Sequence, residues 1–351
     1  MSTCYEYIWL DGIGQLRSKT KISNKSYDNS NLPPLWNYDG SSTYQRFTSE
    51  SEVMLYPTVC YNDPIRGNPH KLVICETSDK NCSRKLAREV FEDTKAEELQ
   101  PMFGLEQEFF IYNTSTGKPL GWPTGPGYPA PQGDYYCSVG NDTCFGRQFI
   151  EKVMNLGIKC GLGLTGFNWE VAPGQGEFQV CNVGIKAADE LLLLRYLLMR
   201  IGEEYNYTIS FDCKPFKDWN GSGLHTNFST KEMRENNNGM ELIYNALKQL
   251  NKTHHEDLKL FGEGNDLRLT GEHETSSIDT FSWGVASRSD SVRIPRSTQE
   301  QGKGYFEDRR PGGNANPYIV TANLFKVTCL DGTSMAEYYV PNSCKKSAVL
   351  W

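Results

Sequence analysis

Short β-prone runs of apolar and aromatic residues recur through residues 5–76, and turn-forming residues separate them. The runs at residues 5–10, 53–57 and 71–75 predict strands, and the first ends at the turn Asp11-Gly12. Residues 37–43 read as a loop from their composition. The chain therefore begins with a small domain of strands and turns.

Helical periodicity begins at Ser83, because apolar and charged residues then recur at helical spacing up to Leu99. Ser83 is a candidate cap for this helix. We place a domain boundary just before it, so residues 1–82 form one domain and residues 83–351 a larger one. Strands and helices do not alternate regularly beyond it, which predicts an α+β fold with an antiparallel sheet. Further strands are expected at 103–112, 177–183 and 207–211, and helices at 187–204, 231–234 and 239–250.

Composition narrows the classes of function. A chain of 351 residues with 38% hydrophobic and 23% charged residues is typical of globular proteins with more than one core. The formal net charge of −7 argues against a nucleic-acid partner. The longest apolar stretch, residues 191–201, is shorter than the ~20 residues of a membrane span. The N-terminus has no basic segment followed by an apolar run, so we expect a cytoplasmic protein that binds no membrane.

Four familiar sequence patterns are absent or misleading. Residues 161–166 match a dinucleotide-binding fingerprint, but strand-like and turn-like residues follow them where that fold needs a helix. No phosphate-binding P-loop occurs, and no second histidine follows His273-Glu274 at the spacing of a zinc protease. The 11 cysteines form no Cys-x-x-Cys pair, which argues against a structural zinc site.

Carboxylates lie where they could hold a cation. Glu106 and Glu108 project from one face if residues 103–112 form a strand. A divalent ion would offset the cost of burying two such groups between aromatic residues, whereas the alternative is a solvent-facing pair. Glu170 and Glu177 lie in an apolar, glycine-rich run, where the alternative is a hairpin with two surface acids.

Histidine and arginine residues extend this pattern. His225, one of only 5 histidines, follows a glycine-rich turn and is either a ligand or a structural hydrogen-bonding residue. Residues 268–276 mix a cation, acids and a histidine, as a charged surface loop also would. In residues 287–310, Glu307 and Arg309 would share a strand face, and the alternative is a solvated charge ladder. Carboxylates and one imidazole favour Mg²⁺ or Mn²⁺, and abundant arginine favours an anionic substrate. The pattern thus indicates metal-dependent phosphoryl transfer without a P-loop.

Several long motifs stand out in the chain: residues 37–43 (NYDGSST), 121–133, 220–223 (NGSG) and 302–311 (GKGYFEDRRP). Together they resemble signatures of the glutamine synthetase family in its eukaryotic-type short form. The likeness runs from about Tyr7 to Tyr318. It implies a small N-terminal β-grasp-like domain and a larger catalytic domain with a curved antiparallel sheet flanked by helices.

The resemblance also implies roles for individual residues. Two or more divalent ions, Mg²⁺ or Mn²⁺, would be held by Glu108, Glu170 and Glu177 and by Glu106, His225 and Glu307. Glutamate would contact Trp219, Asn220, Gly221, Arg268, Arg288 and Arg309. ATP would contact Glu106, Glu177, Asn227, Phe228, Ser229, Arg288, Arg293, Tyr305, Phe306 and Glu307. The residues acting in the reaction would be Asp39, Glu274, Arg293 and Arg309.

In the family's reaction, ATP phosphorylates the side-chain carboxylate of L-glutamate, and ammonia then displaces phosphate. The resemblance implies that Asp39 of a neighbouring subunit binds ammonium and that Glu274 closes over glutamate. It also implies a decamer of two pentameric rings. A γ-glutamyl ligase for another amine and a non-catalytic relative are the alternatives, but Asp39, Glu274 and all six ligand candidates are present. The chain departs from the family pattern at Trp169, usually a small residue, and at Gly176, usually tryptophan.

Overall fold

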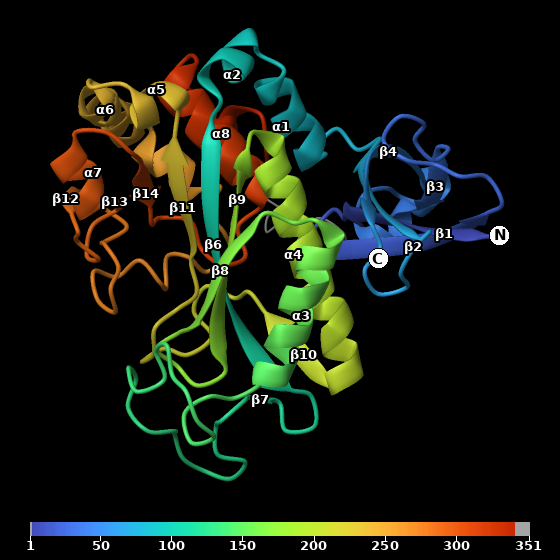
Figure 1. Ribbon diagram of the computed structural model, residues 1–351, viewed down its shortest axis with the longest axis horizontal. Coiled ribbons are helices and arrows are strands. Elements are labelled where there is room, and N and C mark those ends of the chain that lie inside the picture. Colours follow the sequence, from blue (N-terminus) through green and yellow to red (C-terminus); the bar gives the residue numbers. More distant parts are fainter. Residues whose placement is uncertain (1, 341–351) are drawn as a thin grey trace.

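A computed structural model describes residues 2–340 of the chain, and its strands form two sheets (Figure 1). The smaller sheet has the order β2-β1-β5-β4-β3, and all its neighbours are antiparallel except β1 and β5. Tyr7 and Trp9 face a core within this domain, whereas Ile8 belongs to the core of the rest of the molecule. The strands are β1 (Thr3–Leu10), β2 (Leu16–Ser23), β3 (Trp36–Asp39), β4 (Glu52–Asn62) and β5 (Lys71–Thr77).

The larger sheet is curved, and β6 lies near its middle (Figure 1). Its order is β12-β13-β14-β11-β6-β9-β8, with β7 and β10 also paired to β6. All pairs are antiparallel except β12 with β13. The strands are β6 (Met102–Asn113), β7 (Lys118–Pro119), β8 (Leu164–Trp169), β9 (Gln175–Val183), β10 (Tyr207–Ser210), β11 (Leu224–Ser229), β12 (Trp283–Val285), β13 (Val292–Ile294) and β14 (Phe306–Asp308).

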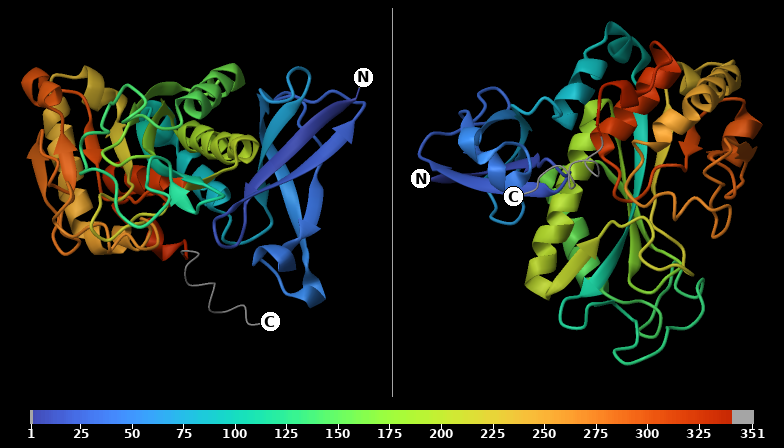
Figure 2. Two further views of the ribbon diagram at one scale, coloured as in Figure 1. Left: turned by 90° about the horizontal axis from the view of Figure 1, so that it is seen from below. Right: turned by 180° about the vertical axis from the view of Figure 1, so that it is seen from behind.

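Helices cover the side of the larger sheet that faces the small domain. α4 lies between the two sheets, and its leucines share one core with Phe103, Phe178 and Ile74 (Figure 2). The side of the sheet that α4 does not cover is left for polar side chains. The helices are α1 (Ser83–Phe91), α2 (Thr94–Leu99), α3 (Arg147–Cys160), α4 (Ile185–Tyr205), α5 (Lys231–Glu235), α6 (Gly239–Leu258), α7 (Arg296–Gln301) and α8 (Pro317–Cys329), with 3-10 turns η1 (Gly40–Thr43), η2 (Thr48–Glu50) and η3 (Met335–Glu337).

The predicted fold class is confirmed, because a small β domain precedes a larger α+β domain with a curved sheet. The boundary between residues 82 and 83 falls in the connection from β5 to α1 and stays a prediction. Residues 341–351 of the predicted catalytic domain lie outside the described residues. Among the described helices, none combines the length and apolar character needed to cross a bilayer.

Three local predictions were wrong. The helix expected over residues 83–99 is two helices, because the Asp93 side chain accepts a hydrogen bond from the backbone N–H of Lys95 and starts a new one. Ser83 is the first helical residue and not the cap, which is Cys82 without a side-chain bond. Residues 37–39, expected in a loop, pair with β4, since a neighbouring strand supplies hydrogen bonds that composition does not reveal.

Candidate active site

Four neighbouring strands bring the predicted ligands to one face of the larger sheet. On β6, Glu106 lies directly opposite His225 of β11, and Glu108 lies directly opposite Glu177 of β9. Glu307 lies on β14, which pairs with β11, and the fifth acid, Glu170, follows β8 at the turn into β9. Alternation along β6 places Glu106 and Glu108 on the same face, so one strand contributes to both sides of the cluster.

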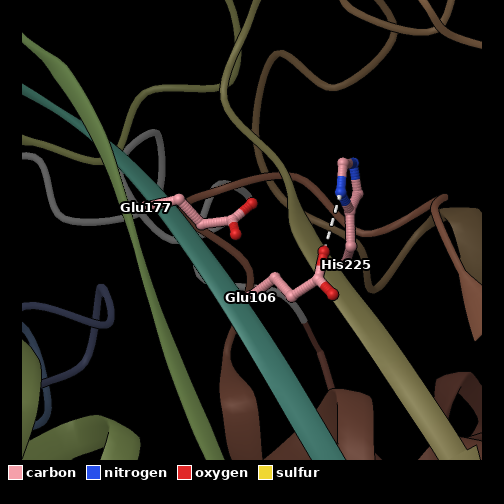
Figure 3. Close-up of side chains that lie close together, drawn as sticks. All are labelled: Glu106, Glu177 and His225. Atoms are coloured by element: carbon pink, nitrogen blue, oxygen red, sulfur yellow. Dashed lines mark ion pairs between the residues drawn. The ribbon is translucent and has the colours of Figure 1, made fainter. Parts of the chain in front are cut away.

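The six side chains approach one another closely. Ligand atoms of Glu106, Glu177 and His225 all lie within 4.8 Å of one another, and so do those of Glu108, Glu170 and Glu177. Figure 3 shows the first three pointing toward one another from separate strands. The Nδ1 atom of His225 is 3.7 Å from Glu106 Oε2 and 3.6 Å from Glu307 Oε1. All six predicted ligand residues therefore converge, and Glu177 belongs to both groups.

Burial makes this cluster costly without a cation. Burial raises the pKa of Glu108 to about 8, and the neighbouring Glu170 adds to the effect. Burial likewise raises the pKa of Glu170 and of Glu177 to about 8, with further contributions from Glu177 and Glu106 respectively. Burial, followed by the positive charge of Arg309, lowers the pKa of His225 well below its usual value, which leaves a neutral imidazole able to bind a metal.

The donor set fits hard divalent cations. Carboxylate oxygens with one imidazole suit Mg²⁺ or Mn²⁺, and neither ligand group of the described residues contains a thiol. A bound cation would remove the repulsion between the buried carboxylates that raises their pKa values.

Amide side chains orient the ligands, and two of these amides were not among the residues predicted from the sequence. Asn168 donates to Glu170 Oε1 and Gln179 donates to Glu177 Oε1, each at 2.8 Å. Both amides lie two residues from the acid that they orient, a spacing that could have revealed them. Asn227, predicted to contact ATP, donates to Glu106 Oε1 at 2.8 Å. Such outer partners fix the direction of each ligand.

Two arginines flank Glu307, which is fully buried. Arg309 pairs with Glu307 Oε1 at 2.7 Å, and Nε of Arg293 lies 2.5 Å from Oε2. Because two guanidiniums share one carboxylate, this edge of the cluster retains positive charge. The edge therefore suits a phosphate or carboxylate group.

Arg268 has a more structural position than the sequence suggested. Its Nη2 donates to the backbone carbonyls of residues 309, 310 and 311, and its Nε donates to Asn265 Oδ1. The buried guanidinium thus holds the segment that carries Arg309. Its side chain also lines a cavity beside the carboxylates.

That cavity joins the predicted metal and glutamate residues. Its predicted members are Glu108, Glu170, Asn220, Gly221, His225, Arg268, Glu274 and Arg309. Gln175, His273 and Thr275 line it too and were not predicted. His273 and Glu274 both have left-handed backbones, with φ of 52° and 61°. Arg288 pairs with Glu274 at 3.2 Å, so an exposed ion pair at the rim holds the residue that is predicted to close over glutamate.

Other predicted residues do not meet the cluster through their side chains. Phe228 and Phe306 are fully buried and pack on each other in the core, so only their backbones could face a nucleotide. Ser229 is also buried, whereas Tyr305 is partly exposed. Trp219 packs against Trp122 at 5.0 Å, beside the turn that begins at Asn220.

Asp39 lies apart from this cluster within the chain. It ends β3 in the small domain, on the opposite side of the molecule from β12 to β14 (Figure 1). Its carboxylate accepts hydrogen bonds from Ser41 and Ser42, and the Ser41 bonds hold its pKa below the usual value.

The fold and the cluster define a class of enzyme: a two-domain α+β protein with a carboxylate-rich site for divalent cations and arginines placed for anionic substrates. The glutamine synthetase catalytic-domain family matches residues 80–253. A chloroplastic glutamine synthetase of Oryza sativa subsp. japonica is 47% identical over 93% of this chain and 78% of its own length. Cytosolic isozymes of Daucus carota and Pinus sylvestris are each 46% identical over 93% of this chain, and they are covered over 94% and 93% of their own lengths. The chain belongs to the glutamine synthetase family.

Proposed function

We propose that the chain ligates ammonia to the side-chain carboxylate of L-glutamate, with ATP as co-substrate, and releases L-glutamine, ADP and phosphate. Membership of the glutamine synthetase family supports this activity. The observation that carries it is that two sets of metal-ligand candidates, and the two arginines paired with Glu307, converge beside one cavity.

The reaction proceeds in two displacements. An oxygen of the glutamate side chain attacks the γ-phosphorus of ATP, the bond to the β-phosphate oxygen breaks, and ADP leaves. The nitrogen of ammonia then attacks the acyl carbon of γ-glutamyl phosphate. The carbon–oxygen bond breaks, phosphate leaves, and the new amide nitrogen loses its extra proton.

Two or more Mg²⁺ or Mn²⁺ ions are assigned to the cluster, with Glu108, Glu170 and Glu177 around one and Glu106, His225 and Glu307 around another. When bound, these ions would neutralise charge on the phosphates and on the reacting carboxylate. Arg293 and Arg309 stabilise the transferring phosphoryl group by charge-assisted hydrogen bonds.

The substrates occupy different parts of the site in this proposal. Glutamate binds in the cavity near Asn220, Gly221 and Arg268, and Arg288 assists at the rim. ATP lies along the segments at residues 227–229 and 305–307. Glu274 closes over glutamate and keeps water from the acyl phosphate.

The ammonium site requires a second subunit. Asp39 is exposed and lies in the small domain, so it can meet the cavity of a neighbouring chain, bind ammonium and favour its deprotonation. We assign the chain to a homodecamer of two pentameric rings, with residues 1–82 as the domain that reaches across. An active monomer in light scattering would contradict this assembly. The cytosolic names of two relatives support a cytoplasmic location.

A coupled ADP-release assay tests the activity. With L-glutamate, ATP and Mg²⁺ or Mn²⁺, ADP and glutamine should form in equal amounts only when ammonium is added. Methylamine and ethylamine in its place would identify a ligase for other amines. No glutamate-dependent ADP release under any of these conditions would overturn the proposal.

A further inference from the structure

The side-chain oxygen of Gln175 is buried and has no hydrogen-bond donor in the part of the chain that the structure describes. The side chain is 1% exposed at the start of β9 and lines the cavity that holds Glu108 and Glu170. Its Nε2 donates to the backbone carbonyl of Gly221 at 3.0 Å and lies 3.4 Å from the Ser222 hydroxyl. Within residues 2–340, Oε1 has no hydrogen-bond partner.

Exchanging the amide oxygen and nitrogen would not remove this deficit. The oxygen would then face the Gly221 carbonyl, which is also an acceptor, and the nitrogen would lose its partner. The contact with Gly221 therefore fixes the orientation of the amide. Burying an acceptor without a donor is unfavourable, so its presence in a cavity wall indicates a donor on the ligand.

The neighbouring charges define which donor fits. Glu108 and Glu170 line the cavity with Gln175, and both disfavour an anionic group beside them. Arg268 and Arg309 line the same cavity and suit carboxylates. An α-amino acid with an acidic side chain matches both, because it has one ammonium group with three N–H donors and two carboxylates.

We propose that Oε1 of Gln175 accepts a hydrogen bond from the α-ammonium group of the amino-acid substrate. Gln175 then determines specificity for L-glutamate over glutarate, the dicarboxylate of equal length that lacks the amino group. The inference rests on the proposed function for the identity of the substrate. The same side chain holds the Gly221 turn through Nε2, so it joins two parts of the glutamate pocket.

Isothermal titration calorimetry with the intact protein and Mn²⁺ tests the inference, with L-glutamate and glutarate as ligands. The wild-type protein should bind glutamate more tightly. Gln175→Met keeps the side-chain length but removes the acceptor, and it should reduce the ratio of the two dissociation constants about tenfold or more. Gln175→Glu keeps an acceptor but loses the donor to the Gly221 carbonyl, so both ligands should bind more weakly while their ratio stays at or above the wild-type value.

A structural role predicts a different pattern. If Gln175→Met weakens both ligands by one factor, the side chain only supports the Gly221 turn and the inference fails. Loss of the ratio in both variants would overturn it too, because an acceptor remains in Gln175→Glu. Gln249→Met, on α6 and away from the cavity, is the matched control and should leave the ratio unchanged.

Failure of the inference and failure of the proposed function are separable. An enzyme that makes glutamine but shows no dependence of the ratio on Gln175 refutes the inference alone. If the wild-type protein makes no glutamine but Gln175→Met still loses the preference for glutamate over glutarate, the α-ammonium contact is supported and the ligase activity is refuted.

Discussion

Trp169 and Gly176 are direct partners across the β8–β9 pair, so their side-chain positions lie on one face of the sheet. The indole is 4% exposed. A Cβ atom on Gly176 would lie 3.0 Å from the ring of Phe167 and 3.3 Å from that of Phe109. This face of the sheet therefore has room for one indole. In this chain it belongs to residue 169, whereas the family pattern has a tryptophan at the position of Gly176.

This pairing predicts strong coupling between the two positions. Trp169→Ala should destabilise the protein by about 3–5 kcal/mol through the cavity it leaves, and Gly176→Trp by about 1–3 kcal/mol through overpacking. The double variant should be more stable than the sum of the single effects predicts, by about 1 kcal/mol or more. Thermal unfolding of the four proteins measures this, and simple additivity would contradict the exchange.

Glu108 should be essential for cation binding. Its carboxylate lies among the acids of the cluster and accepts a hydrogen bond from Gly223 N–H at 2.7 Å. Glu108→Gln should weaken Mn²⁺ binding by more than about 100-fold and reduce turnover at least as much. Glu97→Gln, on the surface of α2, is the control. Unchanged Mn²⁺ affinity, measured by calorimetry, would remove Glu108 from the ligand set.

The metal-free protein should lose stability as pH rises. Each of Glu108, Glu170 and Glu177 has its folded-state pKa raised from 4.5 to about 8, so the folded protein binds more protons than the unfolded chain between these values. Their contribution to stability is full below about pH 4.5 and is lost as pH rises toward 8.

Thermal unfolding with a chelator checks this pH dependence. The unfolding midpoint of Glu108→Gln should rise relative to the wild-type midpoint between pH 5 and 8, by at least about 3 °C. Adding Mn²⁺ at pH 8 should stabilise the wild-type protein more than the variant. A constant difference between the two midpoints over this range would show that the buried carboxylates do not govern stability.

Replacement of Asp39 should weaken the binding of ammonium but not that of ATP. Asp39→Ala should raise the KM for ammonium about tenfold or more and change that for ATP by less than about twofold, because the loss is confined to one charged contact. Asp28→Ala is a close control: Asp28 is exposed in the same domain, accepts bonds from Ser30, and has a lowered pKa for the same reason. Equal effects on both substrates would refute the ammonium role.

Local sequence patterns predicted much of this site because strand alternation is local. Period-two spacing placed Glu106 and Glu108 on one face, and the structure has them there. The long motifs supplied the remaining ligands through family resemblance. The distances among the groups depend on the register between β6, β9 and β11, which no single segment encodes.

What the sequence did not reveal depends on contacts between distant segments. The use of Arg268 to hold the carbonyls of residues 309–311 requires a loop that lies about 40 residues further along the chain. The unpaired oxygen of Gln175 exists only because Gly221 takes the amide nitrogen. The pairing of residues 37–39 with β4 likewise needed a partner strand.

The backbone at His273 and Glu274, at the mouth of the cavity, is strained. Left-handed conformations in successive non-glycine residues store on the order of 1–3 kcal/mol each. The restraints are the Arg288 ion pair and a 3.2 Å hydrogen bond from Arg309 to the Glu274 carbonyl. Arg309 also forms an ion pair with Glu307. A substrate that binds the Arg309 guanidinium would compete with its hydrogen bond to the Glu274 carbonyl. We therefore expect an anion bound at Arg309 to weaken the restraint on residues 273–274.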